Sequence, residues 1–363
     1  MKKIVIVAGD KSGDLYGGFL CRKLNARYPG LELFSFGGPH LAQHSVQTLN
    51  LLSHPVAGLF EVACHLKDII AMFNKAVEEI NTLKPDLIIL IDFPDFNLRL
   101  AKTLNKKFPI LYYVSPQVWA WRKKRIELIK RYVEKMIVIF KFEEDFYRKE
   151  GMDALYFGHP LLEIIPPKLL EEKKEPKKII SFLPGSRKNE IARHLPVMQK
   201  AKRNMESKLK DYHFRIIKPL HLEDTLYKKF APGAELIEHS YEAIAESEFI
   251  VTSSGTATVE IAILEVPFLI IYKVNPFTWY ILKSMVKAEC IGMVNILASK
   301  KIIKELLQNQ ANPKNIAKQT LQYLTDKDKY QQIQYELKKL KKVLSPHGAT
   351  ERLSEYIGKY LKL

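Results

Sequence analysis

Two carboxylates directly after an apolar run are the first candidates for catalysis. Asp92 and Asp95 follow Leu87–Ile91, an uninterrupted apolar run that is typical of a buried parallel strand. In α/β sheets, ligands bind beyond the carboxyl ends of the strands. One aspartate could therefore be a general base, and the other could cap a helix that begins near Asn97. A purely structural role for both aspartates is the alternative.

A second acidic turn, residues 9–14, follows the predicted strand 2–8 and precedes a helix expected over residues 15–25. The turn lacks the GxGxxG spacing of dinucleotide-binding proteins. Asp10 and Asp14 would repel a pyrophosphate. We therefore expect this turn to contact hydroxyl groups.

A third turn, near three quarters of the chain, has residue types that suit a phosphate. Ser253 and Ser254 could cap the helix that follows, and Gly255 lets a ligand approach the backbone. The N–H groups and the positive dipole end of that helix favour an anion. Glu260, one turn further on, could reach ribose hydroxyls. The alternative is an ordinary capped helix in an α/β core.

Arginine and aromatic side chains form two further candidate contacts. Arg187 lies in the turn after the predicted strand 179–183 and could bind a diphosphate in bidentate fashion; a solvated surface arginine is the alternative. Trp119 and Trp121, followed by Arg122, could form a lid or an acceptor rim. The alternative is that one tryptophan packs into the core.

Residues 55–73 carry apolar side chains at helical spacing. One interpretation is a helix that faces the core. The other is that Phe60, Val62, Leu66 and Ile70 partly face outward and contact lipid tails or a membrane surface.

Composition indicates a soluble globular protein. The chain has 363 residues, of which 47% are hydrophobic and 27% charged, enough for two domains with separate cores. No apolar run reaches the ~18–20 residues of a membrane span, and the start of the chain does not read as a signal peptide. We therefore expect a cytoplasmic protein. Cys21, Cys64 and Cys290 lie far apart, so neither a disulfide framework nor a zinc site is indicated.

The formal charge of +17 allows three kinds of partner: nucleic acid, an anionic membrane surface or phosphorylated substrates. No zinc-finger spacing, RNP-type signature or helix-turn-helix pattern accompanies the charge. Nucleic acid is therefore not an expected partner.

Apolar runs alternate with helical stretches, which predicts an α/β fold with parallel sheets in two similar halves. Residues 164–178, rich in Pro, Lys and Glu, are the best linker. We expect domains over residues 1–163 and 164–344, with a C-terminal helix, about 345–363, as a candidate to pack back on the first. His159, near the end of the first domain, could face a ligand or serve as a structural hinge.

With these motifs in place, the sequence resembles the lipid-A-disaccharide synthase family of glycosyltransferases. The motifs occur in family order from residue 4 to about 308, and the string Val114–Arg122 is the most specific of them. The resemblance implies GT-B architecture, in which two Rossmann-like domains have parallel sheets that face a central cleft. The segments that carry it are Ala8–Asp14, Ile91–Asn97, Tyr113–Arg122, Phe157–Pro160, Leu183–Arg187, Ser254–Glu260, Tyr272–Pro276 and Asn295–Ala298.

The resemblance also implies a reaction. An inverting transfer would join UDP-2,3-diacylglucosamine to 2,3-diacylglucosamine 1-phosphate (lipid X), giving the β-1,6 lipid A disaccharide 1-phosphate and UDP in lipopolysaccharide biosynthesis. No metal and no cofactor are implied. The expected setting is the cytoplasm, with peripheral association at the anionic inner-membrane surface, and the expected state is a monomer or homodimer.

Site residues follow from the resemblance position by position. Asp92 looks like the general base for the acceptor 6-hydroxyl. The other positions that match the catalytic surroundings are Asp10, Ser12 and Asn295. The positions that match UDP binding are Arg187, Ser254, Gly255, Thr256, Ala257 and Glu260. The acceptor and membrane candidates are Phe60, Val62, Leu66, Ile70, Trp119, Trp121 and Arg122.

Two departures and two alternatives accompany this hypothesis. The family usually has Glu where this chain has Asp10 and a small residue where it has Lys11; the shorter side chain moves the carboxylate by ~1.5 Å. One alternative is a UDP-N-acetylglucosamine 2-epimerase, which shares the architecture. The other is a non-catalytic nucleotide-binding protein of the membrane surface.

Overall fold

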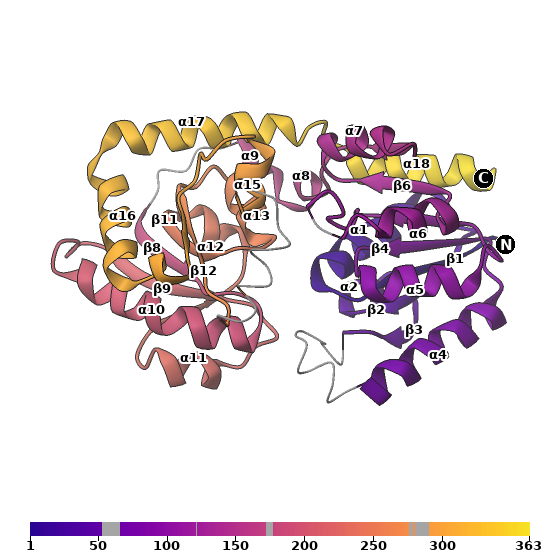
Figure 1. Cartoon of the computed structure of the whole chain (residues 1–363), viewed down its shortest axis with the longest axis horizontal. Helices are drawn as coiled ribbons and strands as arrows, with labels where there is room; N and C mark the ends of the chain where they lie inside the picture. The colour runs from indigo at the N-terminus through magenta and orange to yellow at the C-terminus, as the bar shows by residue number, and fades with distance from the viewer. Residues whose placement is uncertain (53–65, 121, 172–176, 276–278, 280–289) are drawn as a thin grey trace. The chain divides into compact units, whose positions relative to one another are not determined.

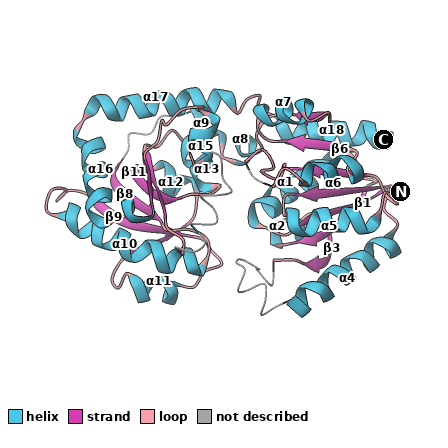
Figure 2. Ribbon diagram, viewed as in Figure 1, coloured by secondary structure: helices cyan, strands magenta, loops and turns pink. Residues whose placement is uncertain are grey.

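A computed structural model gives the structure of the chain (Figure 1), and it divides into two compact units. The first unit comprises Met1–Ile164 and Leu344–Leu363, and the second comprises Ile165–Val343. Each unit has a parallel sheet with helices packed on it (Figure 2). The structure describes residues 1–52, 66–120, 122–171, 177–275, 279 and 290–363.

The sheet of the first unit has seven parallel strands in the order β3-β2-β1-β4-β5-β6-β7. All five residues of β4 are buried, as expected for a strand in the middle of a covered sheet. The strands are β1 (Lys3–Ala8), β2 (Glu32–Gly37), β3 (Val46–Asn50), β4 (Leu87–Ile91), β5 (Ile110–Tyr113), β6 (Lys135–Val138) and β7 (Ala154–Tyr156).

Helices cover this sheet and form its core with alternate strand residues. On one face, Phe73 and Ile80 of α4 join side chains of α5 and α6 over the strands. The segment predicted to be helical over residues 55–73 is helical from Leu66 in its described part and continues to Leu83. The helices of this unit are α1 (Lys11–Arg27), α2 (Pro39–Ala42), α4 (Leu66–Leu83), α5 (Pro94–Leu104), α6 (Arg125–Tyr132), α7 (Lys141–Lys149), α8 (Leu161–Ile164) and α18 (Ala349–Leu361).

The second unit has six parallel strands in the order β10-β9-β8-β11-β12-β13. Its two apolar clusters lie on the two faces of the sheet, one under α10 and α16 and the other under α12, α13 and α17. The strands are β8 (Lys177–Leu183), β9 (His213–Lys218), β10 (Glu235–Glu238), β11 (Ser247–Ser253), β12 (Phe268–Tyr272) and β13 (Glu305–Leu307). The helices are α9 (Pro167–Glu171), α10 (Lys188–Glu206), α11 (Asp224–Phe230), α12 (Tyr241–Ala245), α13 (Ala257–Ile263), α15 (Met293–Leu297), the 3₁₀ turn Gln308–Gln310, α16 (Pro313–Thr325) and α17 (Lys327–Val343).

Each sheet contains one point at which the order of strand addition reverses. The first sheet grows from β1 through β2 to β3, and then restarts with β4 on the other side of β1. The second sheet grows from β8 through β9 to β10, and then restarts with β11 on the other side of β8. In open α/β sheets, the crevice beyond the carboxyl ends at such a switch point is where ligands bind. The switch points are therefore β1/β4 and β8/β11.

The helix after β1 begins earlier than predicted. It starts at Lys11 rather than at residue 15, because Asp10 is its N-cap and accepts a 2.8 Å hydrogen bond from the N–H of Gly13. The predicted turn 9–14 is therefore mostly helix. Ser12 consequently lies in the first turn of α1.

Two predicted helix caps are wrong. Helix α5 begins at Pro94 with Phe93 as N-cap, so neither Asp92 nor Asp95 caps it. In the second unit, α13 begins at Ala257 after Thr256, and no side chain caps it. The hypothesis that Ser253 or Ser254 caps this helix is therefore also wrong.

Helix α18 packs against α1 in the first unit (Figure 1). Arg27 of α1 forms ion pairs with Glu351 at 2.7 Å and Glu355 at 3.0 Å. Gly358 faces Tyr28 so closely that a Cβ there would overlap the tyrosine hydroxyl. Helix α18 therefore supports α1, whose N-cap is Asp10.

Candidate active site

The turn after β4 holds two consecutive residues in the left-handed conformation, Asp92 with φ 41° and Phe93 with φ 46°. This conformation costs roughly 1–2 kcal/mol per residue other than glycine. The Tyr112 hydroxyl and the Asn97 side-chain amide donate hydrogen bonds of 2.6 and 2.8 Å to the carbonyl oxygen of Asp92. The Phe93 ring lies against Gly9, where a Cβ would overlap it. These contacts hold Asp92 in place at the β1/β4 switch point.

Asp10 and Asp92 influence each other across the same switch point. Ala8, at the end of β1, is paired in register with Ile91, at the end of β4, so the two turns are neighbours. Burial, followed by the negative charge of Asp10, raises the pKa of Asp92 to about 8. The Asp92 carboxyl can therefore exchange a proton near neutral pH, which is the property that a general base or acid needs.

The first unit has a further buried carboxyl that the sequence did not indicate. Glu143, in the first turn of α7, is only 2% exposed. It accepts a 3.1 Å hydrogen bond from the indole N–H of Trp119 and a 3.3 Å bond from the N–H of Phe140. Burial raises the pKa of Glu143 to about 8. Glu143 therefore fixes the partly buried Trp119, whose loop follows β5.

Arg122 lies on the surface of the same loop. Its guanidinium binds the exposed carboxylate of Asp95 at 2.9 Å, and Arg125 binds the same carboxylate oxygen. Exposed pairs of this kind contribute little to stability. The two arginines therefore share one carboxylate close to the Asp92 turn.

Two candidates from the sequence have structural roles. The Asp14 carboxylate is 1% exposed and accepts hydrogen bonds from the N–H groups of Gly38, His40 and Leu41 at 2.7–3.2 Å, so it orders the start of α2 rather than facing a ligand. His159 is 1% exposed between aromatic rings, and burial lowers its pKa to about 3. This histidine therefore packs inside the protein rather than facing a ligand, and its role as a hinge stays a prediction.

The turn after β11 offers open space beside its backbone. Gly255 and Thr256 are exposed, and a Cβ added to Gly255 would meet no atom within 4 Å. The Thr258 hydroxyl donates a 2.7 Å hydrogen bond to the carbonyl oxygen of Gly255, and the Ser254 hydroxyl donates to that of Ile291 at 3.5 Å. These bonds order the turn while Gly255 stays accessible to a ligand.

Glu260 is largely buried on α13 and contacts a histidine that the sequence analysis did not single out. Its carboxylate lies 2.9 Å from Nε2 of His239, which follows β10. Burial lowers the pKa of His239, but the hydrogen bond and the charge of Glu260 outweigh it, and the net shift is upward. Glu260 could be singled out from the sequence because it lies one turn into the helix that follows a predicted strand. Its partner His239, 21 residues earlier, could not.

Arg187 and Asn295 differ in their freedom to meet a ligand. Arg187 precedes α10, its side chain is 66% exposed, and its contact with Glu190 is long at 3.4 Å. Asn295 is buried, and its side-chain amide bonds to the backbone of Ile303 and to Glu305 at 2.7–2.8 Å. Arg187 can turn toward an anion, whereas the Asn295 amide orders the segment around it.

The membrane candidates are described only in part. Phe60, Val62 and Trp121 lie outside the described residues, as does the side chain of Leu66. Ile70 on α4 is 43% exposed. None of the helices in the described ranges is long and apolar enough to span a bilayer.

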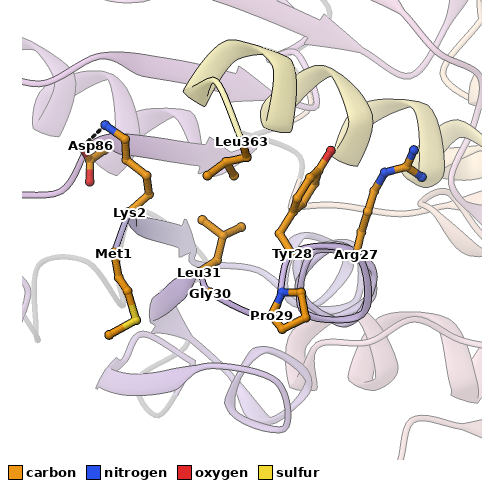
Figure 3. A pocket seen from close by; sticks show the side chains of 9 residues that line it. All are labelled: Met1, Lys2, Arg27, Tyr28, Pro29, Gly30, Leu31, Asp86 and Leu363. Atoms are coloured by element: carbon orange, nitrogen blue, oxygen red, sulfur yellow. Dashed lines mark hydrogen bonds and ion pairs between the residues drawn. The ribbon is translucent and has the colours of Figure 1, made fainter.

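One open pocket of about 630 Å³ lies at the opposite edge of the first sheet (Figure 3). Lys2 precedes β1 and Asp86 precedes β4, so the pocket opens at the amino ends of the strands whose carboxyl ends lead to Asp10 and Asp92. Its charged residues are already paired: Lys2 with Asp86 at 2.8 Å, and Arg27 with residues of α18. This pocket is therefore not the candidate active site. Over the described ranges, His, Cys, Asp and Glu side chains do not gather as ligands of a metal ion.

Two parallel sheets of seven and six strands, each with its candidate residues beyond a switch point, define a protein of the GT-B class. Solved structures of the same fold include the UDP-GlcNAc 2-epimerase from Neisseria meningitidis bound to UDP-GlcNAc, with a TM-score of 0.67 at 12% identity over 98% of this chain and 100% of that one. The calicheamicin glycosyltransferase has a TM-score of 0.61 at 13% identity over 100% of this chain and 98% of that one.

Sequence similarity identifies the family within this class. The family model for lipid-A-disaccharide synthetase matches residues 4–356. The lipid-A-disaccharide synthase of Syntrophus aciditrophicus is 39% identical over 366 residues, covering 97% of this chain and 96% of that protein. The synthase of Geobacter sulfurreducens is 35% identical over 375 residues, covering 98% of each chain. The chain belongs to the lipid-A-disaccharide synthase family.

Membership confirms the predicted family, fold class and activity. The protein is a glycosyltransferase of lipid A biosynthesis, for which the family implies a UDP-sugar donor and a lipid acceptor. The epimerase and the non-catalytic alternatives are not favoured, because the epimerases share only the fold at 12–14% identity.

Proposed function

We propose that Asp92 is the general base of an inverting sugar transfer. Asp92 takes the proton of the acceptor 6-hydroxyl while that oxygen attacks the anomeric carbon of the donor. The new glycosidic bond forms as the bond from the anomeric carbon to the diphosphate breaks, and UDP leaves. The substrates proposed are UDP-2,3-diacylglucosamine and lipid X. The observation that carries the proposal is the position of Asp92 and Asp10 on either side of the β1/β4 switch point.

The proposal gives the other polar residues of the first unit supporting roles. Asp10 raises the pKa of Asp92 and, with Ser12 in the first turn of α1, meets acceptor hydroxyls. Trp119 and Trp121 with Arg122 form the rim for the acceptor headgroup, whose phosphate suits the guanidinium groups of Arg122 and Arg125.

The donor belongs to the second unit in this proposal. Leu183 is paired in register with Thr252, so the turns after β8 and β11 are neighbours at the second switch point. Arg187 and the backbone of Ser254–Ala257 take the charge of the leaving diphosphate, which removes the need for a metal. Glu260, oriented by His239, meets the ribose. Asn295 acts as a positioning residue.

A matched pair of aspartate variants tests the catalytic role. Asp92→Asn keeps the size of the side chain but removes its ability to accept a proton, so kcat should fall about 10²- to 10⁴-fold. Asp153→Asn, at an exposed aspartate beyond the α7 helix, should leave kcat unchanged. UDP release and the mass of the lipid product are measured with defined substrates. Equal activity of both variants would contradict the assignment.

The epimerase alternative has its own control. The protein is incubated with UDP-N-acetylglucosamine alone. An epimerase would convert this nucleotide sugar, whereas the proposed synthase, whose donor is UDP-2,3-diacylglucosamine, leaves it unchanged.

We also propose peripheral association with the cytoplasmic face of an anionic membrane, by a monomer or a homodimer. The support is the net charge of +17 and the exposed Ile70 near the start of α4. The change Phe60→Ser with Leu66→Ser and Ile70→Ser should release the protein from phosphatidylglycerol vesicles without lowering its melting temperature. Val46→Ser, at an isolated apolar side chain that is 62% exposed on β3, is the control and should bind as before. Undiminished binding of the triple variant would contradict the proposal.

A further inference from the structure

A buried histidine connects two loops of the second unit. His194 lies on α10, and Nδ1 is 2.7 Å from the carbonyl oxygen of Pro184. Its Nε2 is 3.0 Å from the backbone N–H of Lys273. A carbonyl oxygen can only accept and an amide N–H can only donate, so Nδ1 carries the proton and Nε2 accepts. The ring is therefore neutral and uses both nitrogens.

The loops that His194 joins lie on either side of the proposed diphosphate turn. Pro184 directly follows β8, and Lys273 directly follows β12. In the sheet, β11 lies between β8 and β12. The turn Ser254–Ala257 follows β11. The side chain of His194 thus joins the loops that follow β8 and β12, which lie on either side of that turn.

A second side chain of α10 supports the same loop. Glu190, one helical turn before His194, accepts a 3.0 Å hydrogen bond from the N–H of Ser186. Gly185 has φ 124°, and a Cβ there would overlap the Glu190 carboxylate. The loop that leads to Arg187 is therefore pressed onto α10 and held at two points, by Glu190 and by His194.

We propose that His194 is a positioning residue that fixes the spacing of the loops around a bound nucleoside diphosphate. The inference rests on the proposed placement of the diphosphate at Arg187 and Ser254–Ala257. His194 does not contact the diphosphate; it acts through Pro184 on the loop of Arg187 and through Lys273 on the loop beyond β12.

The protonation state of His194 then governs donor binding. A protonated ring would point a second N–H at the N–H of Lys273, and the hydrogen bond would be lost. Burial lowers the pKa of His194 and outweighs its hydrogen bonds to Pro184 and Lys273 and the charge of Glu190, which raise it; the charge of Arg193 lowers it further. Burial raises the pKa of Tyr272, whose ring centre lies 6.5 Å away, so this tyrosine stays neutral. Donor affinity is therefore retained at neutral pH and lost on acidification.

Substitution of His194 tests the inference in the full-length protein. His194→Ala removes both hydrogen bonds, at about 1 kcal/mol each, so the Kd for UDP and the KM for the donor should rise roughly 10- to 30-fold. The KM for the acceptor should stay unchanged. His213→Ala, at an exposed histidine at the start of β9 in the same unit, is the matched control and should bind UDP as before.

A second variant covers the case in which His194→Ala does not fold. His194→Gln retains one donor and one acceptor, and should recover most of the UDP affinity. Unchanged UDP affinity in both variants, or an equal rise of both KM values, would overturn the inference.

A titration separates positioning from simple structural support. If His194 holds the loops that UDP needs, UDP must favour the neutral ring, and by reciprocity the pKa of His194 must fall when UDP binds. Nitrogen-15 NMR of the histidine rings of the wild-type protein, with and without UDP, measures this shift. No shift on UDP binding would overturn the inference. Absence of UDP binding to the wild-type protein would instead contradict the proposed donor site.

Discussion

Asp92 combines a strained backbone with a carboxyl that resists ionisation. Its left-handed turn is secured by Tyr112, Asn97 and the ring of Phe93 against Gly9. Strained residues of this kind persist only where neighbouring contacts hold them, and they are concentrated at functional sites. Val114, at the end of the adjacent strand β5, has φ 65°, although β-branched residues rarely adopt this conformation. Residues with a strained backbone conformation therefore lie just beyond the carboxyl ends of β4 and β5.

The pKa of Asp92 predicts a pH profile. Burial and the charge of Asp10 raise this pKa to about 8, so the base form is a minority at pH 7. The kcat/KM should rise about tenfold per pH unit below pH 8 and level off above it. Steady-state rates between pH 6 and 9.5 measure the profile.

A variant that lacks the charge of Asp10 is the control for this pH profile. Asp10→Asn removes the negative charge, so the pKa of Asp92 should fall and the profile should move to lower pH. Because burial is the larger cause, the shift should be partial and the pKa should stay above the ordinary value for an aspartate. A profile that is flat from pH 6 to 9, or that moves to higher pH in the variant, would count against Asp92 as the base.

Single residues could be predicted from the sequence when their type and position after a strand carried the signal. Asp92 and Asp10 are carboxylates directly beyond apolar runs. Glu143 and His194 were missed because each depends on a partner far along the chain, Trp119 and Lys273 respectively. Buried polar groups need hydrogen-bond partners, but a contact between residues far apart in the chain leaves no periodic pattern in the sequence.

The positions of central strands were predictable because uninterrupted apolar runs define them, whereas the edge strands β3, β7, β10 and β13 were not predicted. The predicted strand Leu87–Ile91 agrees with β4, and the predicted strand 179–183 lacks only the first two residues of β8. Helix starts were less predictable. Asp10 caps α1 through Gly13, and Phe93 begins α5 in a left-handed conformation that its residue type does not favour. Caps are set by local geometry rather than by periodicity.

The contact between α1 and α18 gives a prediction about an element. Gly358→Ala would place a methyl group on the hydroxyl of Tyr28, so the tyrosine ring or α18 must shift and the packing of α18 on α1 is disturbed. We expect a loss of about 1–3 kcal/mol in the free energy of unfolding. Gly30→Ala, where a Cβ meets no atom within 4 Å, is the control and should be neutral. Urea unfolding of both variants provides the measurement, and equal midpoints would contradict this packing role for α18.

The order of strands within each sheet is a property of the whole molecule that the apolar runs do not contain. The apolar runs predicted an α/β protein with two halves, but an apolar run does not indicate which other strand it will pair with. The switch points, β1/β4 and β8/β11, became visible only from strand pairing. The pairing at these switch points explains why turns that are far apart in the sequence lie together at the carboxyl ends of the strands.

The division into two units predicts where UDP acts on stability. Each unit has its own apolar clusters. At a UDP concentration 100 times its Kd, the second unit should gain about 2.7 kcal/mol. Hydrogen exchange measured by mass spectrometry should then slow in β8 and β11 and remain unchanged in β1 and β4. Slowing confined to β1 and β4 would place the nucleotide in the first unit instead.

The return of residues 344–363 to the first unit has a consequence for biosynthesis. The ribosome makes the whole second unit before it delivers α18, an interval on the order of 10–40 s at typical elongation rates. During that time the nascent first unit lacks the helix that covers one side of α1. A translation pause before the codons for residues 344–363 would prolong the exposure, so we expect newly made chains to occupy chaperones until these codons have been read.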